Sequence, residues 1–407
     1  MVEYTVPCKG IVAYSQHDWK WEDMYTREPK ADEFLIEMIA TGVCHTDISG
    51  YGGIYPRVLG HEGNQSSVNF PNSTTNSIPP PDTTVHNLTL PIGAGRILRL
   101  GSTSQESKYK VGDLVILSAA ACLQCKYCTT GHPAYCIDHA ALTLASNEPN
   151  FVLASDPSKI IGGGYFGQSS FASPAPVKVS CAANVTKLIR DADELRAYAP
   201  LGCGIMTGAG AITHVGKCEP DDVVAVVGLG GVGLAGICAA KQRGVKNVIA
   251  VDLLQSRIDL AMQHGATVGL LSTKEGLKGE DMSVAIKKLT PGGLGCSHIL
   301  DTSPSVAVLG QCMEALQKNG QLLQVGVKPV GAKYELDLLT HMVNGRRLIG
   351  VIEGDRDPAE ALPELVQWSK DGILPVEKML KEFGVQQFED ARQKMEEGSV
   401  IKSVLVW

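Results

Sequence analysis

From Asp221 onward, short β-branched runs alternate with helical stretches. The runs predict five strands, at 223–227, 247–251, 297–301, 321–325 and 347–351. A helix is expected over 232–243, because Gly244 follows it where helices commonly end. Strands that alternate with helices connect by right-handed crossovers, so this half of the chain predicts a doubly wound parallel sheet.

The amino-terminal half has a different pattern. Its apolar and polar positions alternate over short runs, and Gly and Pro turns separate the runs. This pattern predicts a β-rich domain whose loops carry the chemistry. A chain of 407 residues fits two such domains, so the fold class is predicted as α/β with a second, β-rich domain.

Composition disfavours some classes of binding partner and indicates a cellular compartment. The formal net charge of -7 offers no basic field for nucleic acid or anionic lipid. The apolar run at 223–240 is long enough to suggest a membrane span, but its five glycines favour a buried strand, a turn and a helix. Residues 1–10 lack a secretory signal, so we expect a cytoplasmic protein whose twelve cysteines serve metal binding rather than disulfides.

Residues 64–93 fit neither half. They are rich in Ser, Thr, Asn and Pro and lack apolar periodicity, which predicts an atypical insertion. Three interpretations compete: a functional lid, a loop without function, or a translated intron. The genetic code permits the third, because Gly63-Asn64 can be encoded by GGTAAT and Ile92-Gly93 by ATAGGA, a splice donor and acceptor that preserve the frame.

The strongest chemical signal is a C-x2-C-x2-C-x7-C lobe, the four-cysteine lobe, formed by Cys122, Cys125, Cys128 and Cys136. Such spacing lets one loop wrap four thiolates around an ion, and four protein ligands leave no open position, which is typical of structural zinc. Free buried cysteines and an iron–sulfur cluster are the alternatives. A nucleic-acid zinc ribbon is disfavoured, because Lys126 and His132 are the only basic groups of the lobe.

A second set of metal-type residues is divided among three segments: Cys44-His45-Thr46-Asp47, Gly60-His61-Glu62-Gly63, and 200–204 with Cys203. Two thiolates and one imidazole would leave the fourth position of a zinc ion to water or substrate, which is typical of a catalytic site. Each segment alone fits an ordinary core residue equally well.

The third signal is a G-x-G-x-x-G between a predicted strand and a predicted helix, made of Gly228, Gly230, Gly231, Val232 and Gly233. It is typical of dinucleotide binding when an acidic residue ends the next strand, and Asp252 stands there. A carboxylate at this place accepts hydrogen bonds from the ribose and repels a 2′-phosphate. NAD is therefore predicted over NADP.

Together these motifs resemble the zinc-dependent alcohol dehydrogenases of the medium-chain dehydrogenase/reductase superfamily, over nearly the whole chain. Residues 200–211 resemble the branch with aryl-alcohol and class III enzymes, which has fungal members in secondary metabolism. The resemblance implies a GroES-like catalytic domain over 1–204 and 351–407, which encloses a Rossmann domain over 205–350.

The resemblance also implies that the catalytic zinc is held by Cys44, His61 and Cys203. Asp47 would orient His61 from behind, and Glu62 would lie beside the metal. Thr46 would take the proton of the alcohol.

Around the cofactor, the resemblance implies a further set of contacts. It places His45 and Lys402 near the pyrophosphate and Arg257 near the adenosine ribose. It places Val325 and Val327 along the nicotinamide.

Several positions depart from the family pattern. The spacing from Cys44 to His61 is shorter than in many relatives, and the insertion at 64–93 follows it. Ser49 stands where several relatives place the histidine that ends a proton relay. Ser118 stands where relatives place an aromatic wall of the substrate pocket, so it indicates room for a bulky alcohol; an ordinary surface serine is the alternative.

The predicted reaction is reversible hydride transfer between NAD and a primary alcohol that is aryl, allylic or otherwise bulky, which yields the aldehyde. Two other hypotheses stay open. One is a reductase of the same fold that acts on a secondary-metabolite carbonyl or an activated double bond, and the other is a non-catalytic NAD-binding zinc scaffold. The partners are expected to be a small-molecule alcohol or aldehyde and further copies of the chain, in a homodimer or homotetramer.

Overall fold

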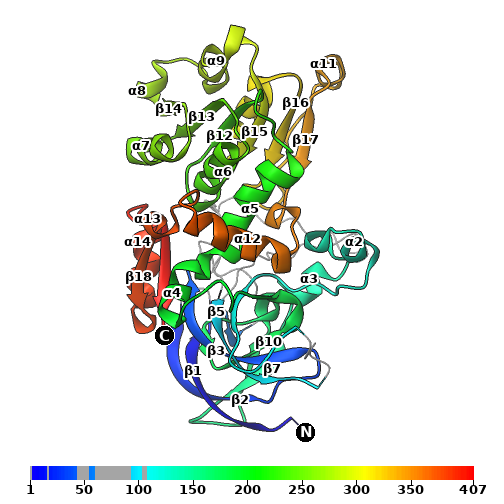
Figure 1. Cartoon of the computed structure of the whole chain (residues 1–407), viewed down its shortest axis with the longest axis vertical. Helices are drawn as coiled ribbons and strands as arrows, with labels where there is room; N and C mark the ends of the chain where they lie inside the picture. Colours follow the sequence, from blue (N-terminus) through cyan, green and yellow to red (C-terminus); the bar gives the residue numbers. More distant parts are fainter. Residues whose placement is uncertain (1, 16–17, 44–54, 60–92, 103–107) are drawn as a thin grey trace.

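A computed structural model describes residues 2–15, 18–43, 55–59, 93–102 and 108–407. The molecule is elongated, with a helix-covered parallel sheet at one end and a β-rich part at the other (Figure 1). This is the α/β architecture of a Rossmann domain joined to a GroES-like domain, as the sequence predicts.

The parallel sheet has six strands in the order β14-β13-β12-β15-β16-β17. Their bounds are β12 (Val223–Val227), β13 (Asn247–Asp252), β14 (Val268–Leu271), β15 (Cys296–Asp301), β16 (Leu316–Gln324) and β17 (Arg347–Gly350). Four of the five predicted strands agree to within one residue at each end. β16 begins earlier than predicted, because its first half is polar and turns at Asn319, whose φ is 59°. β14 was missed because it is short and contains Gly269.

Helices cover this sheet: α6 (Gly231–Gln242), α7 (Gln255–His264), α8 (Lys274–Leu277), α9 (Met282–Lys288), α10 (Val306–Ala315) and α11 (Leu338–Asn344). The predicted helix at 232–243 is α6, and Gly244 ends it with a φ of 77°. The apolar run at 223–240 is divided between β12 and α6, as the glycines indicate. Among the described helices, none combines the length and apolar character that a membrane span requires.

The β-rich part contains two sheets. One holds β1 (Tyr4–Ala13), β2 (Trp19–Arg27), β4 (Arg57–Val58), β7 (Glu148–Leu153), β8 (Ile160–Gly163) and β9 (Ala172–Ser173). The other holds β3 (Glu33–Gly42), β5 (Gly93–Leu100), β6 (Leu114–Leu117), β10 (Ala175–Lys178), β11 (Ala182–Asn184), β18 (Leu380–Gly384) and β19 (Lys402–Val406). Phe34, Ile36 and Ile97 of the second sheet are fully buried and form part of a core shared with the first.

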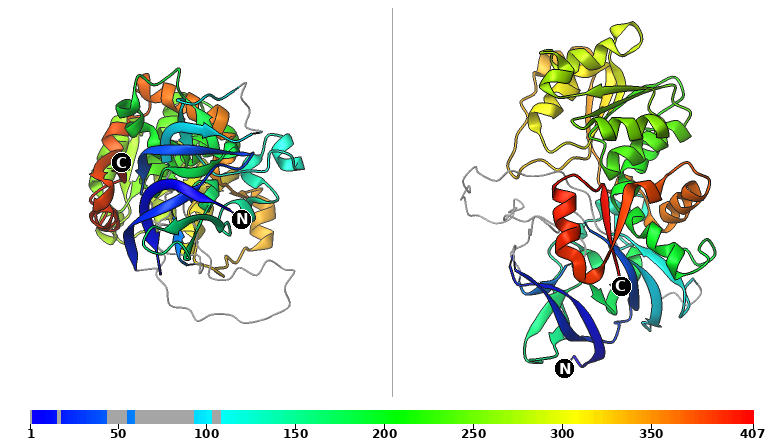
Figure 2. Two further views of the ribbon diagram at one scale, coloured as in Figure 1. Left: turned by 90° about the horizontal axis from the view of Figure 1, so that it is seen from below. Right: turned by 90° about the vertical axis from the view of Figure 1, so that its left-hand side faces the viewer.

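The end of the chain returns to its beginning. β19 pairs antiparallel with β3, with Val404 opposite Gly42, so the last strand extends the amino-terminal sheet (Figure 2, red beside blue). Further helices of the chain are α4 (Ala192–Tyr198), α5 (Gly204–Gly210), α12 (Pro358–Lys370), α13 (Val376–Met379) and α14 (Phe388–Glu396). α5 packs tightly on α6, because a Cβ on Gly208 would lie 1.9 Å from the Val232 carbonyl oxygen.

The predicted insertion at 64–93 needs one correction. Residues 64–92 lie outside the described residues, but Gly93 is the first residue of β5 and pairs with Thr41. No pattern of residues indicates this strand start, because a glycine adds no side chain to the alternation. A Cβ on Gly93 would lie 2.7 Å from the Ser170 Cβ, so the strand needs glycine at this position.

Candidate active site and four-cysteine lobe

The four-cysteine lobe leaves the β-rich part as a compact loop that carries α2 (Lys126–Thr129) and α3 (His139–Leu142) (Figure 1). The sulfur atoms of Cys122, Cys125, Cys128 and Cys136 all lie within 4.8 Å of one another. A tetrahedral zinc with bonds of about 2.3 Å needs sulfur atoms about 3.8 Å apart. The 3.5 Å between Cys125 and Cys128 and the 3.9 Å between Cys122 and Cys128 fit that requirement, and every described cysteine is a free thiol.

The lobe thiols must lose their protons to bind a metal, and their surroundings change how readily they do so. Backbone hydrogen bonds from Cys128 and Ile137 lower the pKa of the Cys125 thiol to about 6. Burial and the hydrogen bonds of neighbouring thiols raise the pKa of Cys128 to about 12. The Cys125 thiol therefore loses its proton more readily than the Cys128 thiol, and a bound cation would favour the thiolate form.

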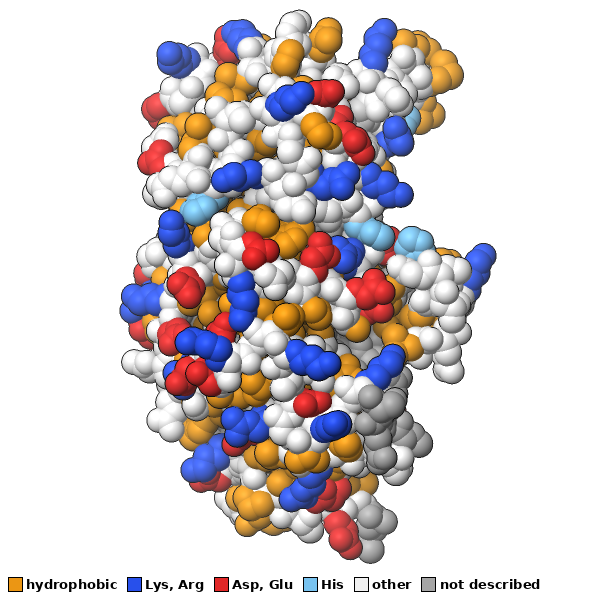
Figure 3. All heavy atoms as spheres, viewed as in Figure 1, with side chains coloured by type: hydrophobic (Ala, Val, Ile, Leu, Met, Phe, Trp, Pro, Cys, Tyr) orange, Lys and Arg blue, Asp and Glu red, His pale blue; other side chains and the backbone are white. Residues whose placement is uncertain are grey.

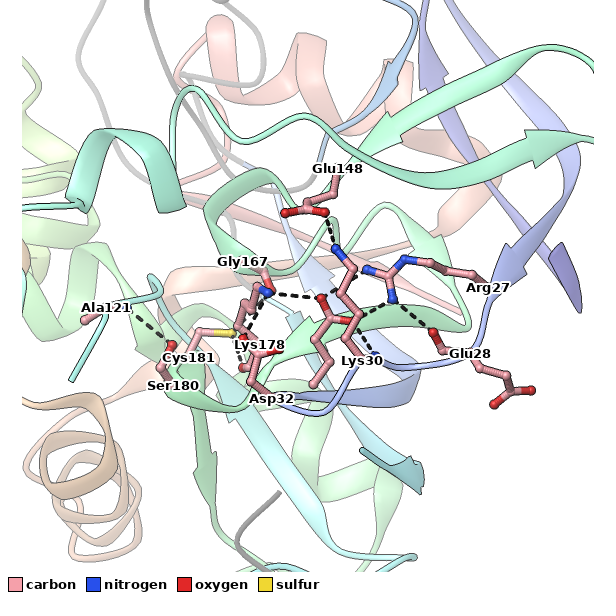
Figure 4. Close-up of polar contacts among 11 residues, drawn as sticks. Arg27, Glu28, Lys30, Asp32, Ala121, Glu148, Gly167, Lys178, Ser180 and Cys181 are labelled. Atoms are coloured by element: carbon pink, nitrogen blue, oxygen red, sulfur yellow. Dashed lines mark hydrogen bonds and ion pairs between the residues drawn. The ribbon is translucent and has the colours of Figure 1, made fainter. Parts of the chain in front are cut away.

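A buried ion cluster supports the base of the lobe (Figure 4). Arg27 makes two hydrogen bonds to Glu33, of 2.6 and 3.0 Å, and Lys178 lies 3.1 Å from the same carboxylate. Burial alone would raise the pKa of Glu33, but the bonds from Arg27 and from the backbone of Lys30 lower it to about 2. From Lys178 the chain continues to Ser180, whose hydroxyl accepts a hydrogen bond from the backbone N of Ala121.

The far side of the lobe contacts the segment by which the chain leaves the parallel sheet. Tyr135 donates from its hydroxyl to the Gly350 carbonyl oxygen at 2.9 Å, and the His132 Nδ1 lies 2.7 Å from a carboxylate oxygen of Asp355. Lobe and segment are therefore fixed to each other by two polar contacts.

Cys203 lies at a break in the chain between a 3-10 turn at Ala199–Gly202 and α5. Its φ of −140° and ψ of −95° are not helical, and its side chain is buried in the β-rich core. The break removes Gly202 from the regular helical ladder, so its carbonyl oxygen needs another partner. The Ser118 hydroxyl supplies it, at 2.7 Å.

This contact also corrects one interpretation of Ser118. The residue is fully buried, so the hypothesis of an ordinary surface serine is wrong. Its backbone N donates to the Cys181 carbonyl oxygen and its own carbonyl oxygen accepts from Gln168. The signal that could have shown its burial is the apolar run 114–117 directly before it.

The glycine motif forms the turn between β12 and α6. Gly228 has a φ of 87°, and a Cβ on Gly233 would lie 1.9 Å from the Gly228 carbonyl oxygen, so both positions need glycine. Gly230 and Gly231 differ, because their Cβ atoms would meet no atom within 4 Å from other described parts of the chain. This open space at the amino end of α6, where Val232 follows, fits a phosphate group close to the backbone.

Asp252 ends β13 beside this turn. Its carboxylate accepts hydrogen bonds from the backbone N of Leu229 at 2.6 Å and of Leu254 at 2.9 Å. Arg257 on α7 lies close enough to Asp252 for attraction, and burial lowers the pKa of its guanidinium. Its Nη2 donates to Gly398, whereas its buried Nη1 has no hydrogen-bond partner among the described residues.

Comparison with known proteins adds to this geometry. Residues 231–371 match the zinc-binding dehydrogenase family, and residues 78–178 match the alcohol dehydrogenase GroES-like domain. Geraniol dehydrogenase of Castellaniella defragrans is 30% identical over 93% of this chain and 92% of its own length. The chain belongs to the zinc-dependent alcohol dehydrogenases of the medium-chain superfamily.

Other members of the family support this assignment over the same length. The structure of benzyl alcohol dehydrogenase from Acinetobacter calcoaceticus has a TM-score of 0.81 and 29% identity, and the match covers 99% of each chain. An S-(hydroxymethyl)glutathione dehydrogenase of Synechocystis is 28% identical over 93% of each chain. The protein is therefore an oxidoreductase of alcohols that contains zinc and uses a nicotinamide dinucleotide.

Several residues predicted for the dehydrogenase site lie outside the described residues. They are Cys44, His45, Thr46, Asp47, Ser49, His61 and Glu62. Their flanks are described: Val43 donates its backbone N to the Ser403 carbonyl oxygen, and Leu59 accepts from Phe171. Lys402 is buried and adjoins Ser403, so it lies beside the strand that leads to Cys44.

Val325 and Val327 follow the carboxyl end of β16 in this dehydrogenase, half-buried and exposed respectively. Two neighbours were missed by sequence reasoning. Thr302 donates from its hydroxyl to both the Val227 and the Gly228 carbonyl oxygens at 3.0 Å, and Lys328 pairs with the buried Asp301 at 2.7 Å. Their position after β15 and β16 could have indicated them, because ligands of parallel sheets bind at the carboxyl ends of strands.

Proposed function

We propose that this dehydrogenase catalyses reversible hydride transfer between NAD and a primary alcohol with an aryl, allylic or otherwise bulky substituent. The observation that carries the choice of NAD is Asp252, a carboxylate beside the open turn of Gly230 and Gly231. Geraniol and benzyl alcohol, after which two relatives are named, are an allylic and a benzylic primary alcohol. The catalytic domain in this proposal comprises 1–204 and 351–407, and the NAD-binding domain 205–350.

The proposal includes two zinc ions per chain. The four-cysteine lobe would hold one in a closed structural site, and Cys44, His61 and Cys203 would hold the other with one position open to the substrate. When bound, this second zinc supplies Lewis acidity that lowers the pKa of an alcohol, while NAD supplies the hydride acceptor. Burial of Cys203 keeps water from that side of the site.

The side chains of the protein would handle the proton and the orientation of the site. Thr46 would accept the alcohol proton, Asp47 would fix His61 by a hydrogen bond to the ring, and Glu62 would lie beside the ligands. Ser49 would stand at the outer end of the proton route, where its hydroxyl can both accept and donate.

Cofactor binding would use the groups around the glycine turn. The backbone N–H groups at the amino end of α6 would receive the pyrophosphate, with His45 and Lys402 adding positive charge. The ribose hydroxyls would bond to Asp252, near Arg257, whose buried Nη1 has no hydrogen-bond partner among the described residues. Val325 and Val327 would line the nicotinamide.

We test this function with purified, zinc-replete protein, by following NADH formation with benzylic, allylic and aliphatic alcohols, and aldehyde reduction in the reverse direction. We expect turnover with primary benzylic or allylic alcohols and a preference for NAD over NADP. A protein that reduces only activated double bonds, or that turns over none of these substrates, contradicts the proposal.

We also propose a second copy of the chain as a partner. β17 is an edge strand of the parallel sheet, and α11 beside it exposes Leu338, Leu339, Met342 and Val343 by 75%, 67%, 71% and 61%. Figure 3 shows hydrophobic side chains gathered at the upper right, where α11 lies in Figure 1. An unpaired edge beside an apolar, uncharged helix fits antiparallel pairing of two β17 strands about a twofold axis.

Light scattering after size-exclusion chromatography tests this partner. The Met342→Glu variant should elute as a monomer, because a charge on α11 would face its own copy in the interface. Leu294→Glu changes an equally exposed leucine elsewhere and serves as the control. A wild-type protein that is monomeric contradicts the proposal.

A further inference from the structure

Gln168 is a fully buried amide in the 164–171 loop, and both ends of its side chain are bonded. Its Nε2 donates to the Ser118 carbonyl oxygen at 2.8 Å, and its Oε1 accepts from the backbone N of Gly93 at 3.3 Å. Gly93 begins β5, and Ser118 directly follows β6. The amide therefore fixes the distance between the start of β5 and the end of β6.

Ser118 carries this link to Cys203. Its hydroxyl donates to the Gly202 carbonyl oxygen, and that carbonyl belongs to the peptide that leads into Cys203. The peptide lies at the break before α5, where the regular helical bonds do not fix it. The Ser118 hydroxyl is therefore a side-chain contact that limits rotation of the Gly202–Cys203 peptide.

The same loop reaches two further strand ends. The Thr41 hydroxyl donates to the Ser170 carbonyl oxygen at 2.8 Å, near the end of β3. The Phe171 backbone N donates to the Leu59 carbonyl oxygen at 3.3 Å, just after β4. One loop thus bonds the ends of four strands, β3, β4, β5 and β6, and through Ser118 it reaches the break at Cys203.

We propose that Gln168 and Ser118 are positioning residues that fix the Cys203 thiolate for metal binding. The inference rests on the proposed function, in which Cys203 is a ligand of the catalytic zinc. A metal site needs its ligands held before the ion arrives, and loss of a group that orients a ligand commonly weakens metal binding about 10- to 100-fold. Among the described residues, the hydrogen bonds of Gln168 and Ser118 do not go to the lobe cysteines, so the effect should be confined to one of the two metals.

The test measures metal loss at each site separately. Zinc-loaded protein is mixed with a competing chelator and iodoacetamide, and mass spectrometry follows alkylation of the Cys203 peptide and of the lobe peptides over time. Metal-bound thiolates are protected, and Cys203 is also buried, so each rate is divided by the rate of the same variant stripped of metal, and this ratio reports metal loss at each cysteine. Ser118→Ala and Gln168→Ala should each make alkylation of Cys203 about 10- to 100-fold faster. The alkylation rates of the lobe cysteines should stay unchanged.

Thr26→Val is the matched control. Thr26 is equally buried, and its hydroxyl also donates to a backbone carbonyl oxygen, that of Asn150 at 2.9 Å, in the other sheet. In the two positioning variants kcat should fall more than KM rises, because the ligand geometry matters most in the transition state. The Thr26→Val variant should change neither value beyond its effect on stability.

Three outcomes are distinguishable from the expected one. If Ser118→Ala and Gln168→Ala lose metal at Cys203 no faster than Thr26→Val, the positioning role is wrong. If alkylation of the lobe cysteines becomes faster by the same factor, the variants loosen the whole domain and the inference also fails. If wild-type Cys203 is alkylated at once while the lobe stays protected, the proposed function itself is wrong.

Discussion

The four-cysteine lobe and the segment around Cys203 are two regions with metal-type residues that depend on the fold in opposite ways. All ligands of the lobe stand between Cys122 and Cys136, and one short loop brings their sulfur atoms within 4.8 Å. Cys44 and Cys203 stand far apart in the sequence, and only the β-rich core can bring their segments together. A local site needs a loop, whereas a distributed site needs the whole domain.

The supporting contacts differ in the same way. The lobe is held by the hydrogen bond from Ala121 to Ser180, close in sequence to Lys178 of the ion cluster, and by the contacts of Tyr135 and His132 on the other side. Cys203 is held by a hydrogen bond to the neighbouring peptide from Ser118, which depends in turn on Gln168. The comparison predicts that changes in the lobe act on stability and that changes around Cys203 act on turnover.

The Cys44→Ser variant is expected to show the largest effect, which is a loss of turnover. Loss of one ligand of the catalytic zinc should lower kcat/KM by about 1,000-fold or more, because Lewis-acid stabilisation is worth several kcal/mol. The number of zinc ions per chain, found by metal analysis, should fall from two to one. The thermal midpoint should stay nearly unchanged. Cys8→Ser is the control, since Cys8 is also buried but lies in β1. Retained turnover in Cys44→Ser would contradict the prediction that the site around Cys203 determines turnover.

Cys125→Ser should have the largest effect on stability. A structural zinc contributes directly to folding, so loss of the lobe metal should cost several kcal/mol and lower the thermal midpoint by about 10 °C. Calorimetry and metal analysis measure both. The zinc at Cys203 should remain, and a variant that loses both ions together would show that the two regions are coupled.

Glu33→Gln tests the ion cluster beneath the lobe. Removing one partner leaves the Arg27 charge buried without its carboxylate, which should cost about 3 to 5 kcal/mol. The folded-state pKa of Glu33 is about 2, below the ordinary value of 4.5, so its contribution is present above pH 4.5 and is lost as the pH falls toward 2. Unfolding curves from pH 5 to pH 2 should show this loss in the wild type and a weaker slope in Glu33→Gln.

Asp252→Ser tests a region that belongs to neither metal. Loss of the carboxylate should weaken NAD binding about 10- to 100-fold, because one charge-assisted hydrogen bond is worth about 1.5 to 3 kcal/mol. The variant should also discriminate less against NADP, and both zinc ions should stay bound. Side-by-side kinetics with the two cofactors measure the change, and a wild type that prefers NADP would contradict the role of Asp252.

The smallest effect is expected from a chain in which Gly63 is joined directly to Ala94. The junction places Gly63 where Gly93 now begins β5, and that position needs glycine because a Cβ would lie 2.7 Å from Ser170. A shorter loop also costs less entropy to close. The shortened protein should bind both zinc ions and be at least as active as the full chain, as measured by metal analysis and kcat/KM.

Two other results of that experiment carry information. Loss of activity with both metals bound would assign residues 64–93 to a lid. Sequencing the transcript tests the translated-intron hypothesis, which predicts a spliced message without this segment.

The sequence by itself determined the parallel sheet and the chemistry of the lobe. Strands β12, β13, β15 and β17 agree with prediction because each contains a short apolar run, β-branched in β12 and β13, with a glycine turn or a helix beside it. The lobe follows from spacing alone, since neighbouring residues in a loop cannot be far apart. Gly228, Gly233 and Asp252 likewise lie within one strand–helix–strand unit, β12–α6–β13.

Only the tertiary structure decided how distant segments support one another. The pairing of β19 with β3, the salt bridge of Lys178 with Glu33 and the link from Gln168 through Ser118 to Gly202 join residues that no local pattern relates. Ser118 shows the reason most plainly. Its identity suggested a pocket or a surface, but a break in the chain at Cys203 leaves a buried carbonyl oxygen that requires a donor. Hydrogen-bond demand inside a core is set by where the backbone leaves regular structure, and the sequence does not show that directly.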